Sequence, residues 1–238
     1  MKKVVLITQA RMGSTRLPGK IMTLFQGHPL LYWFLKRAQM SQTVSQFVVA
    51  TTESDRDDPI HDVVVSDFPE IHITRGSEND VLSRYAQAAQ ETKADIIVRV
   101  TSDCPFLDWE LIDRCVERFI ETGCDALRTL RGDFPIGLDV EVFSRHALDK
   151  ANQEARQEEE REHVGPYIYT NPGLFGIYWL HSEGLHWPPC RLTLDYPEDL
   201  TLVNILYEKV GPLAEAYRYS EYLQRHPEVA AINMKYLK

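Results

Sequence analysis

The chain has 238 residues, enough for one large α/β domain or two small ones with a buried core. Hydrophobic residues make up 44% and charged residues 26%, which excludes a disordered or fibrous protein. No apolar run reaches the roughly 18 residues that span a bilayer. The apolar stretch after Lys3 is also too short for the core of a secretion signal, so we expect a cytoplasmic protein.

The charge is distributed unevenly along the chain. The formal net charge is −9, which argues against a protein that coats nucleic acid. Residues 1–52 nevertheless contain seven Lys or Arg and no Asp or Glu, so the remainder of the chain is strongly acidic. A basic N-terminal segment in an acidic protein predicts a site for a small polyanion, with carboxylates elsewhere able to hold a cation.

The cysteines and histidines show no metal-site pattern. The four cysteines form no CxxC pair, and no histidine lies near them at ligand spacing. The eight histidines form no HxH or HxxxH set. We therefore expect reduced, mostly buried thiols, with neither a zinc site nor a disulfide framework.

Strands and helices alternate regularly in the first half of the chain. Short β-branched and aliphatic runs predict strands, and apolar residues at helical spacing predict helices. The predicted strands are 4–8, 47–50, 71–74 and 95–100, and the predicted helices are 30–40, 59–66, 81–92 and 109–123. Asn79 or Asp80 is expected to cap the third helix, and Asp108 and Gly123 to bound the fourth. The alternation predicts a doubly wound α/β sheet whose ligands bind at the carboxyl ends of the strands.

The alternation becomes less regular after residue 124. Strands are predicted at 124–130, 138–143, 175–180 and 191–194, and helical segments at 144–157, 158–172 and 197–211. No Ser/Gly-rich linker or internal repeat interrupts the chain. We expect one domain over 1–238, with 130–190 as a less regular lobe for acceptor binding or dimerisation. The lobe is rich in aromatic residues, which suit a sugar pocket, a dimer interface or core packing: Tyr167, Tyr169, Phe175, Tyr178, Trp179 and Trp187.

The strongest local signal is the segment QARMGSTRLPGK at residues 9–20. Its glycines allow a close approach of the backbone, Ser and Thr add hydroxyl donors, and three cations suit the oxygens of a triphosphate. The spacing is not that of a Walker loop, because Gly13 and Gly19 are six residues apart and Ile21 follows Lys20. A solvated basic loop is the alternative. The absence of any acid in residues 1–52 favours an anion site.

This strand and loop resemble the signature of the sugar cytidylyltransferases, the group of the CMP-KDO and CMP-sialic acid synthetases, and most of all the branch associated with spore-coat polysaccharide. Four further segments carry the resemblance: RGSENDVLSRY (75–85), RVTSDCPFLD (99–108), GLDVEVFSRHAL (137–148) and RLTLDYPEDL (191–200). The resemblance implies a three-layer αβα fold of the nucleotide-diphospho-sugar transferase kind, similar to glycosyltransferase-A folds, with a mixed, mostly parallel sheet. It also implies a reaction in which CTP and a sugar or sugar acid give CMP-sugar and pyrophosphate, with Mg²⁺ as cofactor and a homodimer as the assembly.

The resemblance assigns roles within residues 9–20. Arg11, Ser14, Arg16 and Lys20 would hold the triphosphate, and Gln9, Ala10 and Gly13 would meet the nucleotide through the backbone. Arg11, Arg16 and Lys20 would also act in catalysis together with Asp103. The sialic acid and KDO enzymes typically have Pro-Ala-Arg at the start of this loop. Gln9 stands in place of that proline, which leaves the base selectivity open.

Two aspartates are candidate metal ligands. Asp103 and Asp195 each follow a predicted strand and precede a turn that contains proline, so both can reach one ion at the sheet edge. The alternative is a turn-forming Asp satisfied by its own backbone. By the resemblance, the two match the pair that holds magnesium in the family. Asp199 is expected to support the start of the following helix.

Other candidates lie farther along the chain. Arg75 would contact the base or the ribose. Asp139 and Glu141 share a strand face by the period of two, and would orient acceptor hydroxyls or pair with arginines. Glu162, next to His163, would form another wall of the acceptor site.

The expected reaction is an in-line attack of a sugar hydroxyl on the α-phosphorus of CTP. Catalysis would then depend on positioning and electrostatics, without a covalent protein nucleophile. A glycosyltransferase that uses a nucleotide sugar, or a non-catalytic nucleotide-binding subunit, are the alternatives.

Overall fold

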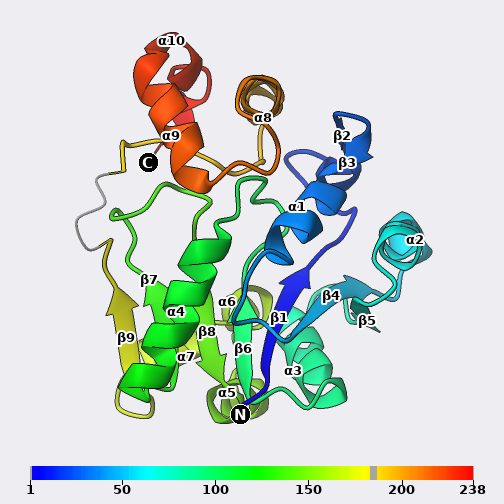
Figure 1. Cartoon of the computed structure of the whole chain (residues 1–238). Coiled ribbons are helices and arrows are strands. Elements are labelled where there is room, and N and C mark those ends of the chain that lie inside the picture. The colour runs from blue at the N-terminus through cyan, green and yellow to red at the C-terminus, as the bar shows by residue number, and fades with distance from the viewer. Residues whose placement is uncertain (1, 183–186, 238) are drawn as a thin grey trace.

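The computed structural model describes residues 2–182 and 187–237. Seven strands form one sheet in the order β5-β4-β1-β6-β8-β7-β9 (Figure 1). They are β1 (Val4–Gln9), β4 (Gln46–Thr52), β5 (His72–Gly76), β6 (Ile96–Arg99), β7 (Ala126–Thr129), β8 (Glu141–Ser144) and β9 (Ile177–Leu180). Strand β8 runs antiparallel to both of its neighbours, and the other pairings are parallel. The predicted mixed, mostly parallel α/β sheet is confirmed.

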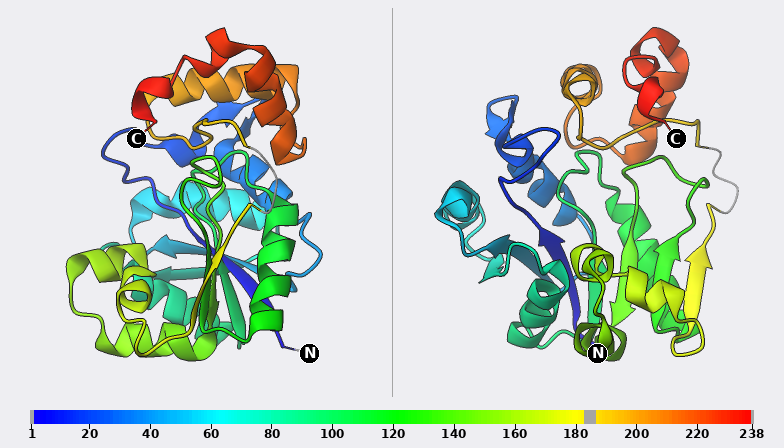
Figure 2. Two further views of the ribbon diagram at one scale, coloured as in Figure 1. Left: turned by 90° about the vertical axis from the view of Figure 1, so that its left-hand side faces the viewer. Right: turned by 180° about the vertical axis from the view of Figure 1, so that it is seen from behind.

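Helices cover both faces of the sheet (Figure 2). One face carries α1 (Leu30–Ala38), α2 (Asp58–Asp67) and α4 (Trp109–Thr122), and the other carries α3 (Val81–Glu91), α5 (Arg145–Glu154), α6 (Glu158–His163) and α7 (Pro166–Thr170). Three more helices lie beyond the carboxyl ends of the parallel strands, namely α8 (Pro197–Lys209), α9 (Ala216–Arg225) and α10 (Pro227–Ala230) (Figure 1). Short 3₁₀ turns occupy Lys20–Met22, Asp55–Asp57 and Met234–Tyr236. The expected three layers are therefore present.

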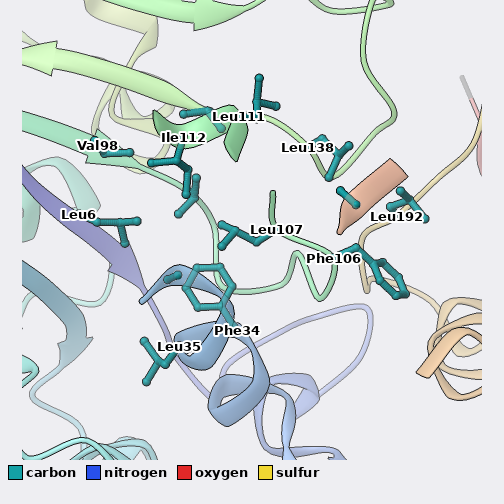
Figure 3. Close-up of a cluster of buried hydrophobic side chains, with 14 of the residues drawn as sticks. Leu6, Phe34, Leu35, Val98, Phe106, Leu107, Leu111, Ile112, Leu138 and Leu192 are labelled. Atoms are coloured by element: carbon teal, nitrogen blue, oxygen red, sulfur yellow. The ribbon is translucent and has the colours of Figure 1, made fainter. Parts of the chain in front are cut away.

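The sheet separates two hydrophobic clusters. On one face, Leu6 and Val98 from the strands meet Phe34 of α1 and Ile112 of α4 (Figure 3). Neighbouring strand residues point to the opposite face, where Val5 and Ile97 pack against α3 and α5. Since β1 is buried on both faces, its residues 4–7 are all apolar rather than alternating.

The predicted helix boundaries at Asp80, Asp108 and Gly123 are confirmed. The Asp80 carboxylate accepts the Ser83 N–H at 2.9 Å, and Asp108 accepts two N–H groups in the first turn of α4. Gly123 ends α4 in the left-handed region, with φ of 64°. These local contacts satisfy backbone groups that the helices cannot pair themselves.

Three expectations for the second half of the chain are wrong. Residues 191–194 form no strand; they make one bridge, Ile136 to Arg191, because Leu192 N–H bonds to the Ile136 carbonyl and Leu194 N–H to the Asp103 carbonyl. The segment 158–172 is two helices rather than one, since Val164 has a φ of 68°. Strand β8 starts at Glu141, which leaves Asp139 outside it.

A small hairpin between β1 and α1 was not predicted. It consists of β2 (Leu24–Phe25) and β3 (His28–Pro29), and its turn has positive φ at Gln26 and Gly27. Among the described helices, none is long and apolar enough to cross a membrane. Cys104, Cys115 and Cys190 are buried free thiols.

Candidate active site

A cavity of about 540 Å³ lies at the carboxyl ends of β1 and β6. Loop 9–20, the start of α3, the segment after β6 and the end of α6 form its walls. Five of its lining residues are cationic and two are acidic: Arg11, Arg16, Lys20, Arg84 and Arg99 against Asp103 and Glu162. This excess of positive charge at a sheet edge favours a ligand with several negative charges.

Gln9 connects the loop to the sheet and to α3. Its carbonyl accepts the Ser102 hydroxyl at 2.7 Å, and its side-chain carbonyl accepts the Tyr85 hydroxyl. The next residue, Ala10, donates its N–H to the Ala50 carbonyl at 3.2 Å, which continues the pairing of β1 with β4. The start of the loop is therefore fixed before the chain turns into the cavity.

Met12 is the centre of the turn. Its carbonyl accepts the N–H groups of Ser14 and Gly19, at 2.9 and 3.1 Å, and Gly19 has a φ of 71°. Its own N–H donates to the Asp57 carboxylate at 2.7 Å. Asp57 is buried and also accepts the Thr52 hydroxyl. Asp57 was missed in the sequence because nothing in its neighbourhood shows that it reaches a loop 45 residues away.

Lys20 brings the two predicted metal ligands together. Its Nζ lies 2.6 Å from Asp103 Oδ2 and 2.9 Å from Asp195 Oδ1. Burial by itself lowers the pKa of Lys20, but the two carboxylates outweigh burial and raise that pKa above its ordinary value. Asp103 and Asp195, which are far apart in the sequence, therefore face one position that a cation occupies.

Asp195 is surrounded by cations. Arg16 and Arg191 each donate to it at 2.6 Å, in addition to Lys20. Burial would raise the pKa of Asp195, yet its hydrogen bonds to Lys20 and Arg191 and the charges of Lys20 and Arg16 hold it below the usual value. Asp199 accepts the N–H groups of Asp195 and Tyr196, so its predicted role at the start of α8 is confirmed.

Two carboxylates that face one position beside a cationic cavity suit Mg²⁺. This ion takes one or two carboxylates from the protein and completes its shell with water and phosphate oxygens. Within 2–182 and 187–237, no cluster of three or more His, Cys, Asp or Glu could hold a metal by protein groups alone. The two carboxylates are by themselves a donor set that suits Mg²⁺ together with phosphate oxygens and water.

Arg11 and the α6 residues meet across the cavity. Arg11 donates to the Glu78 carbonyl at 3.1 Å and lies 3.5 Å from Glu162. Glu162 and His163 both line the cavity, as do Gln9, Gly13 and Ser14. The structure therefore gathers most of the predicted site residues in one place.

Five predicted residues do not line the cavity. Ala10 is buried, and Asp195 meets the cavity through Lys20 and Arg16. Arg75 pairs with Asp58 at 2.6 Å and does not line the cavity. Asp139 lies 3.6 Å from Arg128 and borders a second cavity of about 470 Å³, which is lined by Phe134 and Trp187 among others. Glu141 is buried in an ion pair with Arg99 and lines neither cavity.

Arg84 and Arg99 line the cavity and were not singled out from the sequence. The signal for Arg99 was present, because Ile97 and Arg99 share a face of a strand that is otherwise apolar, and a charge there must have a partner. Burial would lower the pKa of Arg99, but Glu141 outweighs burial and raises it. Arg84 follows Val81 by one turn of α3, which places it on the same helix face.

The mixed, mostly parallel sheet with helices on both faces is the fold of nucleotide-diphospho-sugar transferases. The chain belongs to the cytidylyltransferase family, because the family model described as Cytidylyltransferase matches residues 5–221.

Known proteins agree with this assignment. The spore coat polysaccharide biosynthesis protein SpsF of Bacillus subtilis is 32% identical over 238 aligned residues, which cover 97% of this chain and 98% of that protein. A 3-deoxy-manno-octulosonate cytidylyltransferase of Bdellovibrio bacteriovorus is 28% identical, with 71% of this chain and 74% of that protein covered. The solved structure of a cytidylyltransferase from Leptospira borgpetersenii has a TM-score of 0.89 and 32% identity, and 97% of each chain is covered.

Proposed function

We propose that this protein transfers CMP from CTP to a hydroxyl group of a sugar or sugar acid and releases pyrophosphate, in the synthesis of a cell-surface or spore-coat polysaccharide. The observation that carries the proposal is the convergence of Arg16, Lys20, Asp103 and Asp195 beside the glycine-containing loop. Membership of the cytidylyltransferase family supports CTP as the donor. The names of the relatives support a sugar as the acceptor.

The loop residues carry the electrostatic part of the reaction. Arg11, Arg16 and Lys20 hold the triphosphate oxygens and offset the charge that builds on them as the sugar hydroxyl attacks the α-phosphorus in line. Backbone N–H groups and the Ser14 hydroxyl of the same loop add neutral donors. Gln9, Ala10 and Gly13 form the surface against which the nucleotide lies. Since the attacking group comes from the sugar, the protein supplies no nucleophile and works by positioning.

We assign a divalent metal, Mg²⁺, to Asp103 and Asp195. When bound, the metal would neutralise phosphate charge and orient the leaving pyrophosphate. Without the metal, Lys20 Nζ lies between the two carboxylates and offsets their like charge, so it would turn to the phosphate oxygens when the metal takes that position. Arg191 holds the second oxygen of Asp195 and so fixes its orientation.

The acceptor is expected between the two cavities. Glu162 presents a carboxylate to the first cavity and Asp139 to the second, where Trp187 and Phe134 offer flat surfaces for a sugar ring. Glu141 holds Arg99 and lies 3.9 Å from Arg128, so we assign it a positioning role toward the acceptor. A contact of Arg75 with the base or ribose, the homodimer, the cytoplasmic location and the single domain remain predictions.

The test is a product assay. The purified protein is incubated with MgCTP and a panel of sugars and sugar acids, and pyrophosphate release is measured together with CMP-sugar by mass spectrometry. The proposal predicts stoichiometric pyrophosphate and CMP-sugar for at least one acceptor. If CMP-sugar never forms while a nucleotide sugar donates its sugar to an acceptor, the protein is a glycosyltransferase instead.

A further inference from the structure

Arg84 is the cavity cation that the described residues leave without an acidic partner. Arg11, Arg16, Lys20 and Arg99 each have a carboxylate within 4.0 Å, namely Glu162, Asp195, Asp103 and Glu141. Arg84 is 1% exposed, and its only hydrogen bond among the described residues runs from Nη1 to the Ala50 carbonyl at 3.2 Å. Burying a guanidinium without an ion-pair partner costs free energy. Its position in a cavity wall therefore indicates a bound ligand that supplies the missing acceptors.

One edge of this guanidinium is unused. Nη1 is held by Ala50, and Nε is buried with no hydrogen-bond partner among the described residues. Nη2 has none there either, so both donors of the Nε–Nη2 fork are unpaired, and Arg84 lines the cavity. Burial and the nearby charge of Arg11 lower the pKa of Arg84, which shows that its surroundings disfavour the bare charge. The fork presents two parallel N–H donors to a pair of adjacent acceptors.

The position of Arg84 indicates which part of a nucleotide it meets. Its side chain packs over Gly76 at the end of β5, where an added Cβ would lie 3.0 Å from Arg84 Cγ, and it reaches Ala50 in β4. Lys20 and Asp103 lie past the end of β6, on the other side of β1. Two strand spacings, roughly 10 Å, separate these ends of the cavity. A triphosphate held at Lys20 therefore places its base toward Arg84 and Val81.

We propose that Arg84 reads the base of the nucleotide, with its Nε–Nη2 fork donating to O2 and N3 of cytosine. This proposal rests on the proposed function and names the group that selects its donor. Cytosine offers two adjacent acceptors at O2 and N3, whereas N3 of uracil carries a hydrogen and repels a donor. The stem of the side chain is packed over Gly76, and among the described residues the guanidinium is hydrogen-bonded to the Ala50 carbonyl alone, so the fork reaches the base by a rotation of the guanidinium against that bond. The sequence left the base selectivity open because Gln9 replaces the usual proline. This selectivity is thus assigned to Arg84 on α3.

The experiment uses two substitutions and three ligands. Arg84→Lys keeps the charge and removes the fork, and Arg84→Met removes both. Dissociation constants for MgCTP, MgUTP and inorganic tripolyphosphate are measured by calorimetry. We expect both variants to bind CTP about tenfold to a hundredfold more weakly, the size of effect that a bidentate contact to a base produces. Affinities for UTP and tripolyphosphate should change less than about threefold, so the preference for CTP disappears.

Controls separate the possible failures. Arg225→Met removes a positive charge on the exposed face of α9 and should leave all three affinities unchanged. Tripolyphosphate binding and a cooperative thermal transition show that each variant is folded. An unchanged preference for CTP over UTP, or an equal loss of tripolyphosphate affinity, overturns the role of Arg84 in base reading. A wild-type protein that prefers CTP through Arg84 but forms no CMP-sugar would instead overturn the proposed function and leave this inference standing.

Discussion

The Asp57 carboxylate accepts the backbone N–H of Met12 at 2.7 Å and so attaches the cationic loop to the start of α2. The same carboxylate accepts the Thr52 hydroxyl, and Asp57 is only 3% exposed. The loop conformation therefore depends on an acid that does not itself line the cavity.

Replacement of Asp57 by Ala should loosen this loop. The buried Thr52 hydroxyl and the partly buried Met12 N–H lose their acceptor, which is expected to cost about 1–3 kcal/mol of unfolding free energy. The KM for CTP should rise as well, since the loop loses a fixed point. Denaturant unfolding and steady-state kinetics measure the two effects. Asp55→Ala, an exposed change in the same 3₁₀ turn, is the control, and equal behaviour of the two variants would contradict the anchoring role.

Lys20→Met should impair the chemical step. Loss of one preorganised donor to a developing charge typically lowers kcat by about 10²–10³-fold. The variant also leaves Asp103 and Asp195 without the cation that they share. Single-turnover rates with saturating MgCTP measure the effect, and Lys209→Met, an exposed change on α8, serves as control. A rate within threefold of wild type would remove Lys20 from the mechanism.

The stability contributed by Asp195 should depend on pH. Because its pKa lies below the usual value in the folded protein, the contribution is complete above the unfolded pKa, about 3.9, and is lost as pH falls through the lower folded pKa. The unfolding free energy of wild type should therefore exceed that of Asp195→Asn by a constant amount between about pH 5 and about pH 7.

This difference should shrink below about pH 4. Urea unfolding at a series of pH values gives the comparison. Asp62→Asn, which alters an exposed carboxyl on α2, should show no such narrowing. A difference between wild type and Asp195→Asn that grows on acidification would contradict the assignment.

Glu141→Gln should be strongly destabilising, because it leaves Arg99 buried and uncompensated. The expected cost is about 3–5 kcal/mol. The double variant Arg99→Met/Glu141→Gln should lose less than the sum of its single changes, since the unpaired charge is gone. Glu154→Gln breaks an exposed helix pair with Lys150 and should change stability by less than about 1 kcal/mol. Additive single changes would show that the pair is not coupled.

Two glycines with similar backbone angles allow a steric test. Gly137 and Gly132 have φ of 102° and 93°. An added Cβ at Gly137 would lie 2.4 Å from the Leu192 carbonyl oxygen, whereas at Gly132 no atom of residues 2–182 or 187–237 lies within 4 Å. Both alanine variants carry backbone strain of about 1–3 kcal/mol. Gly137→Ala should lower the unfolding free energy by roughly 1–3 kcal/mol more, because the new Cβ overlaps the Leu192 carbonyl. Equal unfolding free energies for the two variants would mean that residues 137 and 192 are not packed together.

The alternation of strands and helices in residues 1–123 was predictable because each element is set by its own periodicity and end signals. Asp108 and Gly123 bound α4 through contacts with their own neighbours, so the sequence contains the whole signal. The prediction of a strand at 191–194 was wrong because its pairing depends on distant residues. Its residues have strand character, but their hydrogen bonds go to Ile136 and Asp103, which lie in loops.

The sequence by itself determined the kind of site. The acid-free first 52 residues, the glycine loop and two aspartates after strands or turns already predicted a polyanion site with a cation. Tertiary structure decided which charges share one position and which satisfy each other. Lys20 joins Asp103 and Asp195, and Arg75 pairs with Asp58 away from the cavity. Arg84 has no ion pair with an acid in the part of the chain that the structure describes. Charge pairing depends on distances of a few ångströms between segments far apart in the chain, and those distances exist only once the sheet has brought the segments together.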